Sequence, residues 1–153
     1  MTTIADRLAE LGFELPPVAK PVAAYVPAVV TGSLVFTAGQ LPFVSGTLAA
    51  TGKFGAELIA GDGPGLARIC ALNALAAAES VIGSLDRVTR VVKVVVFVAS
   101  TADFTGQPGV ANGASELLGQ VFGDAGQHAR SAVGVPVLPL DAPVEVELIL
   151  EFA

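Results

Sequence analysis

The sequence predicts an α+β sandwich in which two main helices pack on one face of a mixed β-sheet. The expected elements are a β-hairpin, a helix, a strand, a helix and two further strands, in that order. Runs of strands broken by two helices, without an internal repeat, are typical of this class. The 153 residues are most simply one domain, 1–153, which is long enough for a sizeable core.

Each element follows from a local pattern of apolar, glycine and proline residues. Apolar residues that recur about every 3.6 residues, between a polar capping residue and a terminating glycine, indicate a helix. Runs of β-branched residues, or an alternation of apolar and polar residues, indicate a strand. Residues 1–15 form a short helical extension ahead of the sheet. The expected elements are a capped helix at 3–11, an extended proline-rich connector at 14–27, a hairpin at 28–39 turning at Thr31-Gly32, a glycine-rich loop at 41–63, a helix from Asp62 and Pro64 to Gly83, a strand within 84–100, a helix at 110–123, a strand within 124–138, a turn at 139–143 and a strand at 144–152.

The composition indicates a soluble protein that buries surface against other copies of itself. Apolar residues make up 53% of the chain and charged residues 14%, against about 25% charged in ordinary globular domains. Seven cations and seven carboxylates cancel over residues 1–93, so the net charge of −6 comes from residues 94–153. We therefore expect no nucleic-acid partner. No membrane segment or signal peptide is expected, and the single cysteine fits a reducing cytoplasm.

Several kinds of site are disfavoured by the residues present. One histidine and one cysteine, His128 and Cys70, make no metal site with a recognisable spacing. No G-x-S-x-G accompanies His128, which is read as a solvated loop residue, and the glycines at 61–65 match no phosphate-binding motif. Cys70 lies mid-helix without a cationic neighbour and is interpreted as a small buried apolar residue.

The C-terminal strand and the arginine before it carry the most functional information. Alternation puts Val146, Leu148, Leu150 and Phe152 on one face and Glu145, Glu147, Ile149 and Glu151 on the other. Arg130 is the only Lys or Arg after Lys93. A solvated acidic face explains the glutamates. The alternative is a cleft where Arg130 clamps a ligand carboxylate and a glutamate near the strand start activates water.

Five segments resemble, in order, motifs of the RidA/YjgF family of reactive-intermediate deaminases, also named endoribonuclease L-PSP. They cover roughly residues 20–152. The C-terminal signature reads Arg130-Ser131, Leu138-Pro139 and Val144-Glu145-Val146-Glu147. The other segments are "AAYVPAV", "LVFTAGQLP", "VVKVVVFVASTADF" and "VANGASELLGQVF".

The resemblance implies a chorismate-mutase-like sandwich that forms a homotrimer with active sites in the clefts between subunits. It also implies hydrolysis of imines and enamines, such as 2-aminoacrylate, to 2-keto acids and ammonia without a cofactor or metal. Position by position, Arg130 would hold the substrate carboxylate and Glu145 would activate water. Tyr25 would line the cleft from the neighbouring subunit, and Asn112 would supply a hydrogen bond.

The backbone at two further positions would complete the polar frame of the site. The resemblance assigns this role to the N–H of Ala132 and to the carbonyl near Gly39. Two residues depart from the family pattern, since the best-known enzymes carry cysteine at the position of Ala132 and serine at that of Ala38. These departures leave open a second function, a trimeric protein that binds small carboxylates without turnover. Ribonuclease activity is a third, disfavoured by the acidic charge.

Overall fold

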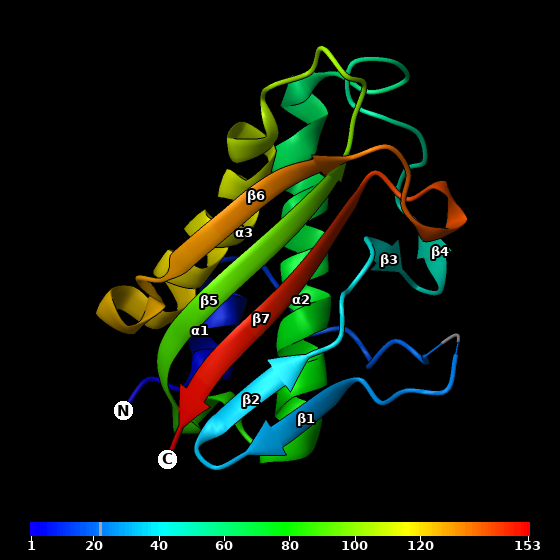
Figure 1. The fold of residues 1–153 in the computed structure, drawn as a ribbon. Coiled ribbons are helices and arrows are strands. Elements are labelled where there is room, and N and C mark those ends of the chain that lie inside the picture. The colour runs from blue at the N-terminus through cyan, green and yellow to red at the C-terminus, as the bar shows by residue number, and fades with distance from the viewer. Residues whose placement is uncertain (22) are drawn as a thin grey trace.

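A five-stranded sheet with two long helices behind it forms the molecule, in a computed structural model that describes residues 1–21 and 23–153. The strand order is β1-β2-β7-β5-β6, and only β5 and β6 run parallel. Figure 1 shows both helices on one side of this sheet. The elements are α1 (Ile4–Glu10), β1 (Ala28–Thr31), β2 (Leu34–Thr37), β3 (Phe43–Val44), β4 (Thr47–Leu48), α2 (Gly63–Ile82), β5 (Val88–Ala99), α3 (Gln107–Phe122), β6 (Ala129–Val135) and β7 (Val144–Phe152).

The predicted α+β class and the order of the main elements are confirmed, with differences at the boundaries. The hairpin turns at Gly32-Ser33, one residue later than expected, because Thr31 still pairs with Leu34. Two short strands, β3 and β4, interrupt the expected 41–63 loop, and α3 begins three residues before 110. The connector at 14–27 contains no helix or strand in its described part, and Val22 lies outside the described residues.

The core lies between the sheet and helices α2 and α3. From β7, Val146, Leu148 and Leu150 point into it, as alternation predicts. Helix α2 packs against α3 and β7 and is buried along most of its length. Residues 60–82 are long and apolar enough to span a membrane, but 61% of that window is buried inside the fold. Helix α2 is therefore explained as the core helix of a soluble protein.

Within the described residues, the other face of the sheet carries no helix (Figure 1). Phe36 of β2 and Val133 of β6 are exposed there, at 40% and 44% of their full surface. Phe97 and Ile149 on the same face are half-buried. Glu145 and Glu147 share this face, since they alternate with the buried residues of β7. We refer to it below as the open face.

Truncation of a core leucine should measure how much the α2 contact contributes to stability. Leu75 of α2 is fully buried. We expect Leu75→Ala to lower the free energy of unfolding by about 2–5 kcal/mol, since it removes apolar contacts and leaves a cavity. Val81→Ala, on the exposed side of the same helix, should change it by less than about 0.5 kcal/mol. Urea unfolding measures the free energy of unfolding of both variants. An equal decrease in the two variants would contradict the burial of Leu75 in the core.

Candidate functional site

Helix α3 holds the guanidinium of Arg130 in place. Arg130 Nη1 donates to Asn112 Oδ1 at 2.8 Å and to Ser115 Oγ at 3.2 Å. Asn112 and Ser115 are three residues apart in α3 and therefore share one side of that helix. Both hydrogen bonds use Nη1, so within the described residues the Nε–H and Nη2–H donors of Arg130 remain available to a ligand. Such a guanidinium can bind a carboxylate through two parallel bonds.

His128 supports Arg130 through Ser115. His128 Nδ1 lies 2.7 Å from the carbonyl oxygen of Gly126, which can only accept, so Nδ1 is protonated. His128 Nε2 lies 2.9 Å from Ser115 Oγ. Ser115 Oγ therefore links His128 to Arg130, from whose Nη1 it accepts a hydrogen bond. His128 lies in the loop before β6, as expected, but it is half-buried and hydrogen-bonded rather than solvated.

The Ser115–His128 pair does not form a catalytic triad. In a triad, a carboxylate orients the imidazole through Nδ1–H, whereas here Nδ1–H is bonded to the Gly126 carbonyl. Ser115 Oγ in turn accepts a hydrogen bond from Arg130 Nη1. The pair is better described as a support for the arginine.

Glu145 is the candidate carboxylate of the site, and its side chain is partly removed from solvent. Its side chain is half-buried on the open face, and burial, followed by the neighbouring charge of Glu147, raises its pKa above the ordinary 4.5. A Cβ at Gly39 would overlap Glu145 Oε1 and lie within 3.0 Å of its Cγ. The glutamate therefore uses space that only glycine leaves open. A desolvated carboxylate with a raised pKa is suited to proton transfer near neutral pH.

A β-bulge places Gly39 beside this carboxylate. Thr37 Oγ accepts from the Leu148 N–H at 2.9 Å, and Gln40 exchanges both backbone hydrogen bonds with Val146, at 2.8 and 3.0 Å. Residues 38 and 39 thus stand opposite the single residue 147. Such an extra residue disrupts the ladder and leaves backbone groups free for other partners. The Gly39 N–H accordingly has no acceptor within the described part of the chain.

Tyr25 approaches the bulge from the connector. Tyr25 and Gly39 line the same small cavity, of about 50 Å³, together with Leu140. Tyr25 remains 47% exposed, and Leu140 has a φ of 61°. Such a backbone conformation is uncommon outside glycine and is enriched at functional positions. Tyr25, Gly39 and Glu145 therefore form one group in a single chain.

Ala132 presents backbone donors and acceptors at the free edge of β6. The Val135 carbonyl accepts from the Ser100 N–H across the β5 side. Backbone direction alternates along a strand, so Ser131 and Val133 also face β5, whereas Arg130 and Ala132 face outward. Because β6 is the last strand of the sheet, the Ala132 N–H is open to a ligand or to another chain.

The predicted site residues fall into two groups that one chain does not bring together. Arg130 stands beside Val94 of β5, and Glu145 stands opposite Phe97 of the same strand. The two residues lie two strand spacings apart across the sheet and three residues apart along the strands. This places their Cα atoms about 14 Å apart. Their side chains also project from opposite faces, since Arg130 contacts α3 and Glu145 lies on the open face. Asn112 and Ala132 belong with Arg130, and Tyr25, Ala38 and Gly39 belong with Glu145.

Ser115 and His128 are the members of the arginine group that sequence reasoning missed. Ser115 follows Asn112 by three residues on a predicted helix, which is a spacing that places both side chains on one face. His128 precedes Arg130 by two residues and lies immediately before the start of β6. Only the helical spacing of Asn112 and Ser115 was visible in the sequence. The hydrogen bonds that join the three residues depend on how α3 packs against β6.

Cys70 is buried, as predicted, and its environment does not activate it. Its Sγ lies 3.6 Å from the Val144 carbonyl oxygen, and burial raises the pKa of the thiol well above its usual value. A thiol must ionise to act as a nucleophile. In the part of the chain that the structure describes, no cluster of three or more His, Cys, Asp or Glu side chains is placed to hold a metal ion.

A mixed sheet with two main helices on one face defines the class: the protein has the chorismate-mutase-like α+β fold. A family model described as "YjgF/chorismate_mutase-like, putative endoribonuclease" matches residues 5–152. The chain therefore belongs to the YjgF/RidA family, as its motifs predicted. Protein TCP17 of Trypanosoma cruzi is 46% identical over 151 residues, which cover 97% of this chain and 93% of that protein.

Solved structures agree with this assignment over nearly the whole chain. The Agrobacterium tumefaciens protein Atu1372, described as having unknown function, is 42% identical, with a TM-score of 0.92 over 98% of this chain and 92% of that one. A "putative endoribonuclease" from Shewanella oneidensis is 33% identical, with a TM-score of 0.95 over 98% and 99%. Escherichia coli TdcF, solved with bound serine, is 26% identical, with a TM-score of 0.65 over 91% and 94%.

Proposed function

We propose that this protein hydrolyses reactive imines and enamines derived from amino acids, such as 2-aminoacrylate, to 2-keto acids and ammonia. The observation that carries the proposal is the pair of complementary half-sites. One presents an arginine with free donors, and the other presents a half-buried glutamate of raised pKa beside a backbone bulge. The hydrolysis of a substrate that carries a carboxylate needs an arginine to bind that carboxylate and a glutamate to activate the attacking water. We place the protein in the cytoplasm, which suits its buried thiol.

Association of three copies would complete the site by setting the arginine group of one protomer against the glutamate group of the next. Opposite faces of one sheet cannot line one cleft, whereas a head-to-tail ring joins two different surfaces at every interface. The exposed Phe36 and Val133 of the open face give such a ring apolar surface to bury. This supports the homotrimer that the family resemblance implies.

The residues of the two half-sites suggest how the reaction proceeds. Arg130 binds the substrate carboxylate, with the outward N–H of Ala132 beside it. The enamine takes a proton on its terminal carbon and loses one from nitrogen to become the imine. Glu145 then removes a proton from water as the oxygen attacks the imine carbon, and gives it to the imine nitrogen, which forms a carbinolamine. The hydroxyl proton next passes through Glu145 to nitrogen as the carbonyl forms and the C–N bond breaks, which releases ammonia and the 2-keto acid. Tyr25 and the free Gly39 N–H flank this reaction centre.

Binding without turnover is the second candidate, and two positions favour it. Ala132 and Ala38 supply no side-chain thiol or hydroxyl to the site, although their backbone groups are retained. TdcF holds an amino acid, which shows that a relative of this chain binds a small carboxylate. Ribonuclease activity is disfavoured by the net charge of −6.

Ammonia release from enzymatically generated 2-aminoacrylate and from larger amino-acid-derived imines distinguishes the first two candidates. The proposal predicts release above a protein-free blank, together with formation of the 2-keto acid. Binding of 2-oxobutyrate that depends on Arg130, without any turnover, would establish the binding protein instead.

Removal of the Ser115 hydroxyl should weaken substrate binding more than it slows the reaction. Ser115 fixes the orientation of Arg130 through one hydrogen bond, and such a bond contributes about 0.5–1.5 kcal/mol. We expect Ser115→Ala to raise KM about threefold to tenfold and to leave kcat nearly unchanged. Ser115→Thr keeps the hydroxyl and should restore KM. A loss confined to kcat would contradict the positioning role.

A methyl group at Gly39 should displace the catalytic carboxylate. The Gly39→Ala side chain would overlap Glu145 Oε1, and the glutamate can move aside without unfolding the sheet. Misplacing a catalytic group by about 1 Å costs on the order of 100-fold in rate, so we expect kcat to fall about 10- to 100-fold. Gly61→Ala, which meets no atom within 4 Å, is the control. Steady-state kinetics and thermal unfolding of both variants test this prediction; unchanged kinetics in Gly39→Ala would contradict it.

A further inference from the structure

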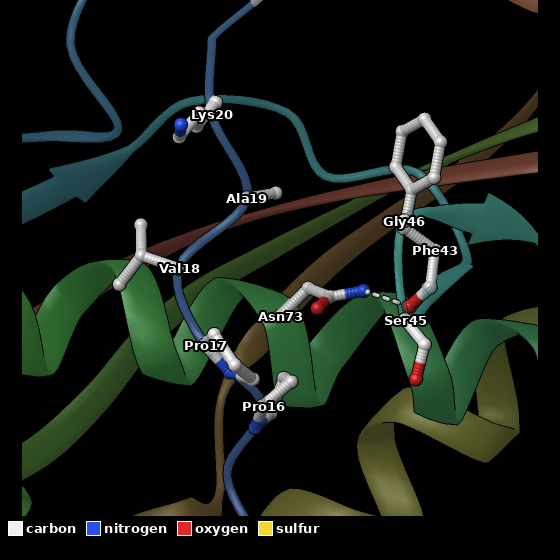
Figure 2. A pocket seen from close by; sticks show the side chains of 9 residues that line it. All are labelled: Pro16, Pro17, Val18, Ala19, Lys20, Phe43, Ser45, Gly46 and Asn73. Carbon is white, nitrogen blue, oxygen red and sulfur yellow. Dashed lines mark hydrogen bonds between the residues drawn. The ribbon is translucent and has the colours of Figure 1, made fainter.

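A cavity of about 430 Å³ lies between the connector and helix α2 (Figure 2). It adjoins the small cavity beside Tyr25 and Gly39, because Ala19, Lys20 and Phe43 line both. Its walls are mostly apolar and include Pro16, Pro17, Val18 and Phe43. Pockets of about 300–1,000 Å³ with apolar walls and a few fixed polar groups are typical of small-molecule sites. Neither Arg130 nor Glu145 lines this cavity.

Asn73 of α2 provides the fixed polar atom of this cavity. The side chain is only 3% exposed, and Nδ2 donates to the Leu41 and Phe43 carbonyls at 3.2 and 3.0 Å. Because carbonyls only accept, these bonds fix which end of the amide is oxygen. Figure 2 shows the nitrogen directed to Phe43 and the oxygen directed away from it.

The Asn73 side-chain oxygen is a hydrogen-bond acceptor that is available to a ligand. It receives no hydrogen bond within the described residues. In that part of the chain, every side-chain oxygen that is shielded from solvent has a hydrogen-bond partner. Because the Asn73 oxygen has none, it must be in contact with open space. Since Asn73 lines the cavity, that space is the cavity itself. A ligand N–H that enters the cavity can donate to this oxygen.

The other polar groups of the cavity select a negative charge. Lys20 and Ser45 line it, whereas no carboxylate side chain does. This differs from the chain as a whole, whose net charge is −6. Lys20 is exposed on the connector, and its flexible stem lets the ammonium reach an anionic group at the mouth.

We propose that this cavity binds a free amino acid with an apolar side chain. The ligand ammonium donates to Asn73 Oδ1, the carboxylate pairs with Lys20, and the side chain packs against the prolines and Phe43. Because Asn73 presents an acceptor, the corresponding 2-keto acid would place oxygen against oxygen and is excluded. The inference does not depend on the proposed deaminase activity.

Calorimetric titration of the full chain with L-leucine and L-phenylalanine tests the proposal. We expect saturable binding of at least one, and binding of 4-methyl-2-oxopentanoate at least about tenfold weaker than that of L-leucine. Val18→Trp should abolish binding by filling the cavity, whereas Arg130→Ala should retain it. Lys20→Gln should weaken it about threefold to fivefold, and Lys53→Gln, outside this cavity, should not.

Three results would overturn the proposal. They are an absence of saturable binding at millimolar amino acid, full binding by a folded Val18→Trp variant, and loss of binding in Arg130→Ala with retention in Val18→Trp. The last pattern would place the amino acid at the arginine half-site. Circular dichroism of each variant establishes that it is folded.

Discussion

Replacing Arg130 by alanine should lower kcat/KM for imine hydrolysis by about 100-fold or more, which is typical for removing one partner of a buried charge pair. Under the proposed function the guanidinium binds the substrate carboxylate, while Asn112 and Ser115 accept hydrogen bonds from its Nη1. Arg130→Lys should recover little, because an ammonium cannot form the two parallel bonds of the guanidinium. The assay is ammonia release with purified protein, at several substrate concentrations.

A matched surface arginine separates this effect from a loss of positive charge in general. Arg90 is exposed on β5, and Arg90→Ala should change kcat/KM by less than about twofold. Thermal unfolding should show that Arg130→Ala remains folded. If Arg130→Ala retains activity within about tenfold of the wild type, a difference of only about 1.4 kcal/mol, the assignment of Arg130 as the carboxylate-binding group is wrong.

Replacing Glu145 by glutamine should affect the chemical step, with kcat about 100- to 10,000-fold lower and KM little changed, as expected for a lost general base. The base must be ionised to accept a proton from water. Because burial raises the pKa of Glu145 above 4.5, wild-type activity should decline with acidification at a higher pH than an ordinary glutamate would give. Any residual activity of Glu145→Gln should lack this acidic limb. A similar acidic limb in the variant would assign the base elsewhere.

The same pKa shift predicts that Glu145 lowers stability at neutral pH. A carboxyl group whose pKa is higher in the folded than in the unfolded state favours folding only while it is protonated. That contribution is present below pH 4.5 and is lost as pH rises through the raised pKa. Glu145→Gln should therefore raise the Tm at pH 7 and not at pH 4. An equal rise at both pH values would contradict the ionisation argument.

The long elements were predictable because their periodicity extends over many residues. The long run without charge between Arg68 and Glu79 identifies α2 as a helix, and the strict alternation of β7 identifies its buried side. The two-residue strands β3 and β4 are too short to carry a period. The bulge at residues 38 and 39 was also invisible, since it exists only in the register of β2 against β7.

The separation of Arg130 from Glu145 could not be read from the sequence for a related reason. Strand β6 consists mostly of small residues, with no apolar alternation to show which face Arg130 takes. Its parallel pairing with β5, which sets both face and distance, is a tertiary property. The family motif predicted that the two residues act together, and the fold adds that they cannot do so within one chain.

Mixing two inactive variants tests the central claim, that each site takes Arg130 from one protomer and Glu145 from its neighbour. Arg130→Ala and Glu145→Gln chains would be unfolded together in equal amounts, refolded and assayed for ammonia release. In a closed head-to-tail ring, about one interface in four then receives both native residues, so about a quarter of wild-type activity should return. If the mixture stays as inactive as the separate variants while refolding into mixed oligomers, the shared site does not exist.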